Sequence, residues 1–161
     1  EMYYMMFVQI QNDMNDLESN LMDEINWVNN TVDWSYMDLR DAFLFDVDLI
    51  GANLRYANLR DAYLGYADLR GANLSNANLM GAAVFYANLS NADLSNANLH
   101  DADLFYSNLS NADLRDANLI DANLADANLF NADLFDAYLN YAYLVDANLN
   151  YANLSLSLIH I

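Results

Sequence analysis

A five-residue unit, Ala-Asn/Asp-Leu-X-X, repeats through the sequence without an insertion or a deletion. In steps of five from Leu39 to Leu154, Leu occupies 23 of the 24 central positions, and Val84 occupies the other. Ala stands two residues before the centre in 21 of the 24 units, and Asn or Asp stands one residue before it in 19. This period limits the possible folds more than any other property of the chain.

A period of five fits neither common secondary structure. On an α-helix, five residues advance a side chain by about 500°, so successive leucines would spiral around the axis and form no face. On a β-strand, an odd step sends each Leu to the opposite side of the sheet. The leucines can therefore share one interior only if the backbone turns a corner within every unit.

This residue pattern resembles the pentapeptide repeat family over about 120 of the 161 residues. The resemblance implies an all-β fold, a right-handed quadrilateral parallel β-helix (solenoid) in which four units make one turn of 20 residues. It also implies that the central Leu and the Ala two residues before it point inward, while the other three positions point outward. The 24 units then predict about six coils.

Residues 1–31 lie outside the repeat and begin with a short apolar segment. An amphipathic helix is predicted after it, because apolar residues follow at intervals of three and four at Met14, Leu17, Leu21, Ile25 and Val28. Residues 1–31 are thus interpreted as a short N-terminal α-helical region, either a cap for the solenoid or a segment that binds a partner, and residues 32–161 as the β-helix. Since the chain begins with Glu1, it is interpreted as a processed or incomplete product.

The charge and composition exclude several functions. With 23 acidic residues against five Arg and no Lys, the net charge is −18, which argues against direct binding to nucleic acid or to an anionic membrane. A basic protein surface or a cation is the electrostatically suitable partner. The absence of Cys removes thiolate chemistry and Cys-based metal sites, and no apolar run reaches the roughly 18 residues of a membrane span. The cellular compartment stays open.

The outward polar positions form columns when the sequence is read in steps of 20. Amide ladders along the stack are predicted for Asn58, Asn78, Asn98 and Asn118, for Asn88, Asn108, Asn128 and Asn148, and for Asn91, Asn111 and Asn131. Stacked Asp residues are predicted at Asp93, Asp113 and Asp133, and in the pairs Asp41 with Asp61 and Asp101 with Asp121. Repulsion should raise some of their pKa values and would allow cation binding, although solvated polar positions are the simpler interpretation.

No catalytic constellation is recognised, so the sequence predicts no enzyme, no cofactor and no metal site. His100 and His160 fall in one column but about 14 Å apart, which is too far for joint metal ligation. No pair of carboxylates is predicted to have a nucleophile or a base beside it.

Aromatic residues give the strongest functional signal. One side of four consecutive coils should carry Phe43, Phe45, Tyr63, Tyr66, Phe85, Tyr86, Phe105 and Tyr106, followed by Tyr143 and Val145. Such a stripe calls for a cover, either the N-terminal segment or another subunit. The C-terminal residues Leu156, Leu158 and Ile161 suggest a second contact, because an open apolar layer implies either a truncated chain or an end that docks onto another copy.

Two functions follow from these features. The first is a non-enzymatic structural protein that assembles with itself, through its coil ends and its aromatic face, into a dimer, fibre or filament. The second is an acidic DNA mimic, which the family resemblance implies, with a DNA-binding protein such as DNA gyrase or a related topoisomerase as its basic partner. Residues 32–161 carry 17 Asp and five Arg, which gives a net charge of −12. Duplex DNA as long as six stacked coils carries roughly 17 phosphate charges.

Overall fold

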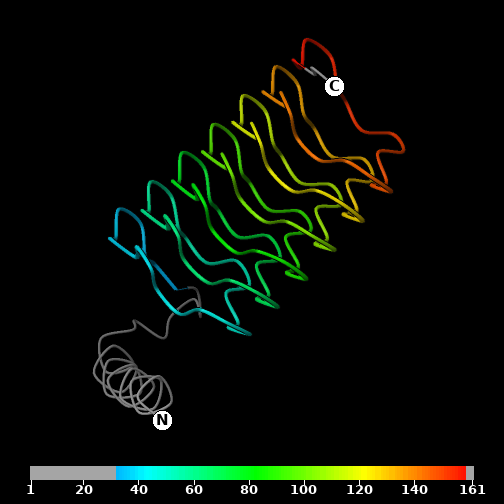
Figure 1. Cartoon of the computed structure of the whole chain (residues 1–161). Coiled ribbons are helices and arrows are strands. Elements are labelled where there is room, and N and C mark those ends of the chain that lie inside the picture. The colour runs from blue at the N-terminus through cyan, green and yellow to red at the C-terminus, as the bar shows by residue number, and fades with distance from the viewer. Residues whose placement is uncertain (1–31, 159–161) are drawn as a thin grey trace, which may run out of the picture. The chain divides into compact units, whose positions relative to one another are not determined.

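The computed structural model describes residues 32–158, which belong to one compact unit, Thr31–Ile161. The predicted N-terminal helix within 1–31 and the terminal residue Ile161 lie outside the described residues. Within the unit, the chain winds around one axis in successive coils, which run in order from the blue end to the red end of Figure 1.

Each coil contains 20 residues, as the family resemblance implies. Single parallel bridges join residues 20 apart throughout the stack, from Asp33 with Asn53 to Tyr138 with Leu158. No helix and no extended strand occurs in 32–158; the pairing consists of these isolated bridges, separated by a turn in every unit. Among the same residues, no helix is long and apolar enough to cross a membrane.

The corner predicted for every unit is a tight turn. Its hydrogen bond runs from the Ala amide to the carbonyl of the preceding central Leu, as from Ala102 to Leu99 at 3.0 Å. The residue two after each centre has a positive φ near 60° at every unit from Tyr36 to Leu156. Together these features have the φ signs of a type II turn. This explains why Gly, Asn and Asp are common at this position, which we call the corner position.

The backbone hydrogen bonds between coils hold the stack together. The Leu99 amide donates to the Asn118 carbonyl at 2.7 Å, and the Asn118 amide donates to the Ala97 carbonyl at 2.9 Å. The same pattern recurs in each unit, so the peptide groups of the inner coils are paired with the coils on both sides.

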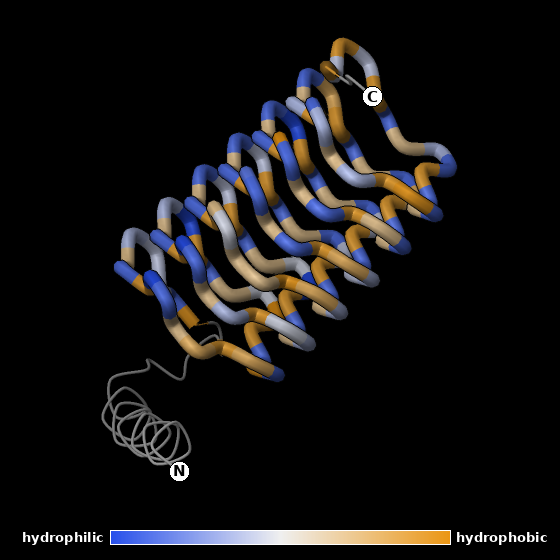
Figure 2. The backbone as a smooth tube through the Cα atoms, viewed as in Figure 1, coloured by the Kyte–Doolittle hydropathy of each residue, from blue (hydrophilic) through white to orange (hydrophobic). Residues whose placement is uncertain are grey.

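The inward positions are confirmed. From Leu49 to Leu139, the central residues and the Ala residues two before them are at most 1% exposed. At Ser107, which replaces an inner Ala, the hydroxyl donates to the Leu104 carbonyl at 2.7 Å, so the buried polar group is satisfied. In Figure 2 the tube alternates between hydrophobic and hydrophilic colours within each coil, as this pattern requires.

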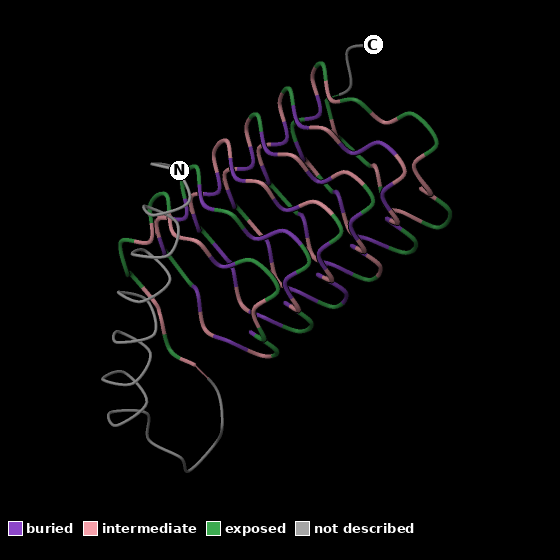
Figure 3. Cartoon of the chain, turned by 60° about the horizontal axis from the view of Figure 1, so that its bottom comes forward, coloured by how far each residue is buried: buried purple, intermediate pink, exposed green. Residues whose placement is uncertain are grey.

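Several small residues at the outward positions are nevertheless buried. Ser75, Ser90 and Ala125 are at most 8% exposed, although they stand one residue after a centre. At Gly65, another residue of this kind, an added Cβ would lie 2.7 Å from the ring of Phe85. A small side chain in a column is covered by larger neighbours from adjacent coils. Figure 3 also shows that burial is greatest in the middle coils and lower in the first and last described ones.

Candidate interaction surface

The aromatic residues of one face form a continuous network of ring contacts. We call this set the aromatic face: Phe43, Phe45, Tyr63, Tyr66, Phe85, Tyr86, Phe105 and Tyr106. The contacts lead from Phe43 to Phe45 and Tyr63, from Phe45 to Tyr66, and onward to Tyr106, with ring centroids between 4.6 and 6.3 Å apart. The rings thus lie side by side, as a reading in steps of 20 predicts; their role as an interface stays a prediction.

Three tyrosines stack in a column along one corner of the aromatic face. The rings of Tyr66 and Tyr86 lie 5.0 Å apart with an interplanar angle of 7°, and those of Tyr86 and Tyr106 lie 5.2 Å apart at 9°. All three occupy corner positions with φ between 55° and 62°. A positive φ is unfavourable for bulky residues, so each Tyr at this position costs more conformational free energy than Asn or Gly would. Ring stacking offsets part of that cost.

The aromatic face is substantially open to solvent. Its exposed members range from 44% for Tyr86 to 53% for Tyr63, while Phe43, Phe85 and Phe105 are half-buried. Phe85 packs over Gly65, whose missing side chain makes room for the ring. These contacts hold the rings in a fixed arrangement, which lowers the entropy cost of binding a partner.

The other predicted interface residues do not join this network. Among the described residues, the ring contacts of this face end at Tyr106, because Asn123 and Ala125 occupy the next coil. Tyr143 and Val145 follow one coil later and are 57% and 49% exposed. Leu156 and Leu158 are exposed on other sides of the last coil, and Ile161 lies outside the described residues. A separate ring pair that the sequence reading missed, Phe130 with Tyr151, has centroids 5.4 Å apart.

The predicted Asn ladders are confirmed at most links. Asn78 donates to Asn58 at 3.1 Å, Asn98 to Asn78 at 3.2 Å, and Asn118 to Asn98 at 3.1 Å. The second ladder continues in the same way as far as Asn148, and in the third Asn131 donates to Asn111 at 3.0 Å. In the first two ladders, the side-chain oxygens also accept the backbone N–H two residues later, as Asn98 does from His100 at 3.3 Å. An amide suits this position because it donates and accepts at once.

The expected rise in the pKa values of stacked Asp residues is wrong for Asp113. Arg115 donates to Asp113 through Nε at 2.8 Å and also lies 3.8 Å from Asp133. Hydrogen bonding from the guanidinium lowers the pKa of Asp113 below its ordinary value. Repulsion within this column is therefore compensated by an Arg that contacts two stacked carboxylates.

We expect Arg115→Gln to lower stability in a pH-dependent way. Because the pKa of Asp113 is lower in the folded protein, its ion pair stabilises the fold at pH values above about 4 and loses this effect as Asp113 is protonated. The difference in melting temperature between wild type and Arg115→Gln should be largest near neutral pH and should vanish in acid. Arg55→Gln is the control, because Arg55 lies over the Tyr56 ring. A difference that is independent of pH would contradict the prediction.

The structure corrects the prediction that no pair of carboxylates has a nucleophile or a base beside it. His100 has acidic neighbours: its Nδ1 atom lies 2.8 Å from Asp101, and Asp121 stacks beside them in the next coil. The stacked pair Asp101 and Asp121 therefore does have a potential base beside it. The signal was present in the sequence, since His100 directly precedes the first residue of a pair already recognised as stacked.

Comparison with known proteins agrees with the fold. The family model for pentapeptide repeats matches in eight copies over residues 42–81, 57–100, 85–120, 97–134 and 127–157. The repeated turns, the 20-residue coil and this match define the class: a β-helical solenoid protein. The chain belongs to the pentapeptide repeat family, whose members form right-handed quadrilateral β-helices.

Three solved structures illustrate the similarity. The pentapeptide repeat protein Rfr23 from the cyanobacterium Cyanothece 51142 is 39% identical, with 58% of this chain and 64% of that chain covered and a TM-score of 0.57. For alr5209 from Nostoc PCC 7120, the values are 31% identity, 64% and 84% coverage, and a TM-score of 0.55.

The third structure is HetL from Nostoc sp. strain PCC 7120, a protein involved in the regulation of heterocyst differentiation. It is 31% identical, with 78% of this chain and 73% of that chain covered and a TM-score of 0.50. The present chain spans about two thirds of the length of Rfr23. A comparison with curated proteins found no match.

Proposed function

We propose that this protein is a non-enzymatic structural protein that associates with further copies of itself through the aromatic face. The observation that carries this proposal is the continuous network of contacts among the eight rings of this face, in which Tyr66, Tyr86 and Tyr106 stack along one corner. The rings point outward and add nothing to the Leu and Ala interior. Together with the neighbouring rings they form an exposed apolar surface, which a contact with another copy would bury.

Burial of this surface would supply the driving force for association. Eight neighbouring rings, most of them about half exposed, make an apolar area of the kind that soluble proteins usually cover. Aromatic residues are also enriched in the centres of protein interfaces. Stacking between coil ends, through Leu156, Leu158 and Ile161, is a second contact in the same hypothesis and would extend a dimer into a fibre or filament.

Charge predicts how this association responds to salt. The units that carry the aromatic face also carry Asp46 and Asp103, and the next units on that side carry Asp126 and Asp146, whereas all five Arg belong to other sides of the coil. Two copies that meet through this face bring like charges together. Added salt screens that repulsion and favours apolar contact, so self-association should become stronger as the salt concentration rises.

Sedimentation velocity of the full chain at micromolar concentration tests the proposal. We expect dimers or larger species that increase between 50 and about 500 mM NaCl. Tyr66→Asn, Tyr86→Asn and Tyr106→Asn combined should weaken association at least about tenfold, because Asn fits the corner but removes the rings. The matched control is Tyr36→Asn with Tyr56→Asn, a stacked pair on another corner with centroids 4.9 Å apart. A monomeric wild type, or equal loss in both variants, would refute the role of this face.

The alternative function is that of an acidic DNA mimic that binds a basic surface of DNA gyrase or a related topoisomerase. The 17 Asp against five Arg in 32–161 favour it. Arg side chains of the chain itself nevertheless pair with five of the described Asp residues, which reduces the net field: Asp38, Asp61, Asp68, Asp113 and Asp133. Binding to a basic partner should weaken with salt, opposite to self-association. Unchanged supercoiling by gyrase in the presence of this protein would remove the alternative.

A further inference from the structure

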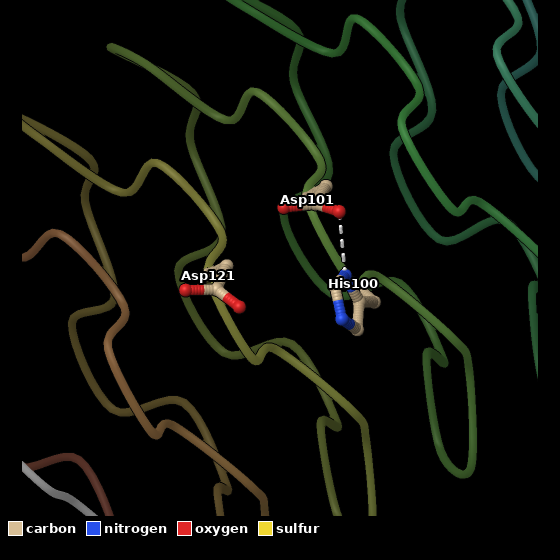
Figure 4. A group of neighbouring side chains, drawn as sticks. All are labelled: His100, Asp101 and Asp121. Carbon is tan, nitrogen blue, oxygen red and sulfur yellow. Dashed lines mark ion pairs between the residues drawn. The ribbon is translucent and has the colours of Figure 1, made fainter.

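One corner of the solenoid brings an imidazole and two carboxylates together. Asp101 and Asp121 stand at corner positions of adjacent coils, each with φ 58°, and His100 directly precedes Asp101. The Asp101 amide donates to the Ile120 carbonyl at 3.1 Å, which fixes the two coils against each other. Figure 4 shows the three side chains on neighbouring turns, with His100 directed at Asp101.

The imidazole of His100 places one ligand atom in this cluster. Its Nδ1 atom is shielded from solvent and lies 2.8 Å from Oδ2 of Asp101, yet it has no partner with hydrogen-bond geometry among the described residues. One ligand atom each from His100, Asp101 and Asp121 lie within 4.8 Å of one another. A ring nitrogen and two carboxylate oxygens thus converge in one small volume.

No guanidinium compensates this pair of carboxylates. Each of the five Arg has another partner in the described structure: Arg40 contacts Asp38, Arg60 contacts Asp61, Arg70 contacts Asp68, Arg115 contacts Asp113 and Asp133, and Arg55 lies over Tyr56. The column of Asp113 and Asp133 has its cation built in, as Arg115. Beside Asp101 and Asp121, the cluster offers the imidazole of His100 in place of a guanidinium. Imidazole is also a good metal ligand.

We propose that His100, Asp101 and Asp121 form a binding site for one divalent transition-metal ion of the Zn²⁺ type. Imidazole nitrogen with carboxylate oxygen is a donor set that suits Zn²⁺ and similar ions, whereas Mg²⁺ and Ca²⁺ prefer oxygen ligands alone. Around a tetrahedral Zn²⁺, ligand atoms lie about 3.4 Å apart, so side-chain rotations that move these atoms by about 1 Å would close the site. Three protein ligands leave a fourth position for water.

Isothermal titration of the full chain with ZnCl₂ tests this site. About 150 mM NaCl and millimolar MgCl₂ should be present, so that the diffuse attraction of a net charge of −18 is screened. We expect one Zn²⁺ per chain in the micromolar range. Loss of an outer-shell partner already weakens metal sites by about 10–100-fold, so His100→Ala and Asp121→Asn should each weaken binding at least about tenfold.

Two control variants distinguish a specific metal site from the nonspecific attraction of cations to an acidic protein. Asp116→Asn changes a corner Asp that stacks with Asp136 in a column without His, and His160→Gln removes the other histidine. Both variants should bind Zn²⁺ as the wild type does. If His100→Ala folds poorly by circular dichroism, His100→Gln keeps a similar side-chain volume. Equal Zn²⁺ binding by wild type and the His100 variants, or displacement of Zn²⁺ by millimolar Mg²⁺, would overturn the proposal.

Discussion

Ala82→Leu should destabilise the solenoid, whereas Ala83→Leu should have little effect. The two alanines are neighbours, but Ala82 is fully buried in the interior and Ala83 stands at the outward position before Val84. The interior admits one large and one small side chain per side of each coil. Three additional carbon atoms at Ala82 would have to push Val84 and the leucines of adjacent coils apart, and interiors of protein density resist this. We expect a loss of about 1–3 kcal/mol or more.

Denaturant unfolding followed by circular dichroism measures this difference. Ala83→Leu is the matched control, because the same atoms are added one residue away on the solvent side, with an expected change within about 0.5 kcal/mol. Equal destabilisation by both substitutions would mean that the five-residue pattern does not separate interior from exterior at this unit. If the dependence of the unfolding free energy on denaturant concentration (the m-value) is unchanged, the substitution lowers stability without changing the cooperativity of unfolding.

Asn98→Ala should remove a central link of the first Asn ladder and cost about 2–3 kcal/mol. Asn98 donates to Asn78 at 3.2 Å, accepts from Asn118 at 3.1 Å and accepts the backbone N–H of His100 at 3.3 Å. The Ala variant leaves two partly buried donors and one acceptor with fewer partners. Unsatisfied groups of this kind cost more than the net value of the bonds themselves.

Asn98→Asp tests which role of the amide matters more. A carboxylate still accepts from Asn118 and from the His100 backbone, and only the donation to Asn78 is lost. We therefore expect a smaller loss of about 1 kcal/mol at neutral pH. Thermal unfolding of both variants measures the difference. If Asn98→Ala and Asn98→Asp destabilise the protein equally, only the amide N–H donor of Asn98 stabilises the ladder. The proposed stabilisation of the turn by the side-chain oxygen is then refuted.

Reading the sequence in steps of 20 predicted correctly which residues lie in one column, but it did not predict how their side chains interact. It placed Tyr66, Tyr86 and Tyr106 in one column, and the rings do stack. It did not foresee that these residues would adopt a positive φ, because the corner position is recognised only when the turn itself is seen. It also placed Asp113 above Asp93 and below Asp133 but missed the long side chain of Arg115, which lowers the pKa of Asp113.

The sequence by itself determined the interior and the period of this protein. A repeat of Leu and Ala every five residues buries all of them only if the backbone turns a corner in every unit, and the family resemblance adds four units to a coil. A strict period without insertions then leaves no freedom in the register between coils. Outward positions carry no such constraint. Their contacts depend on rotamers and on which neighbours lie above and below, so only the tertiary structure placed Phe85 over Gly65 and directed His100 at Asp101, beside Asp121. Both proposed sites depend on those contacts.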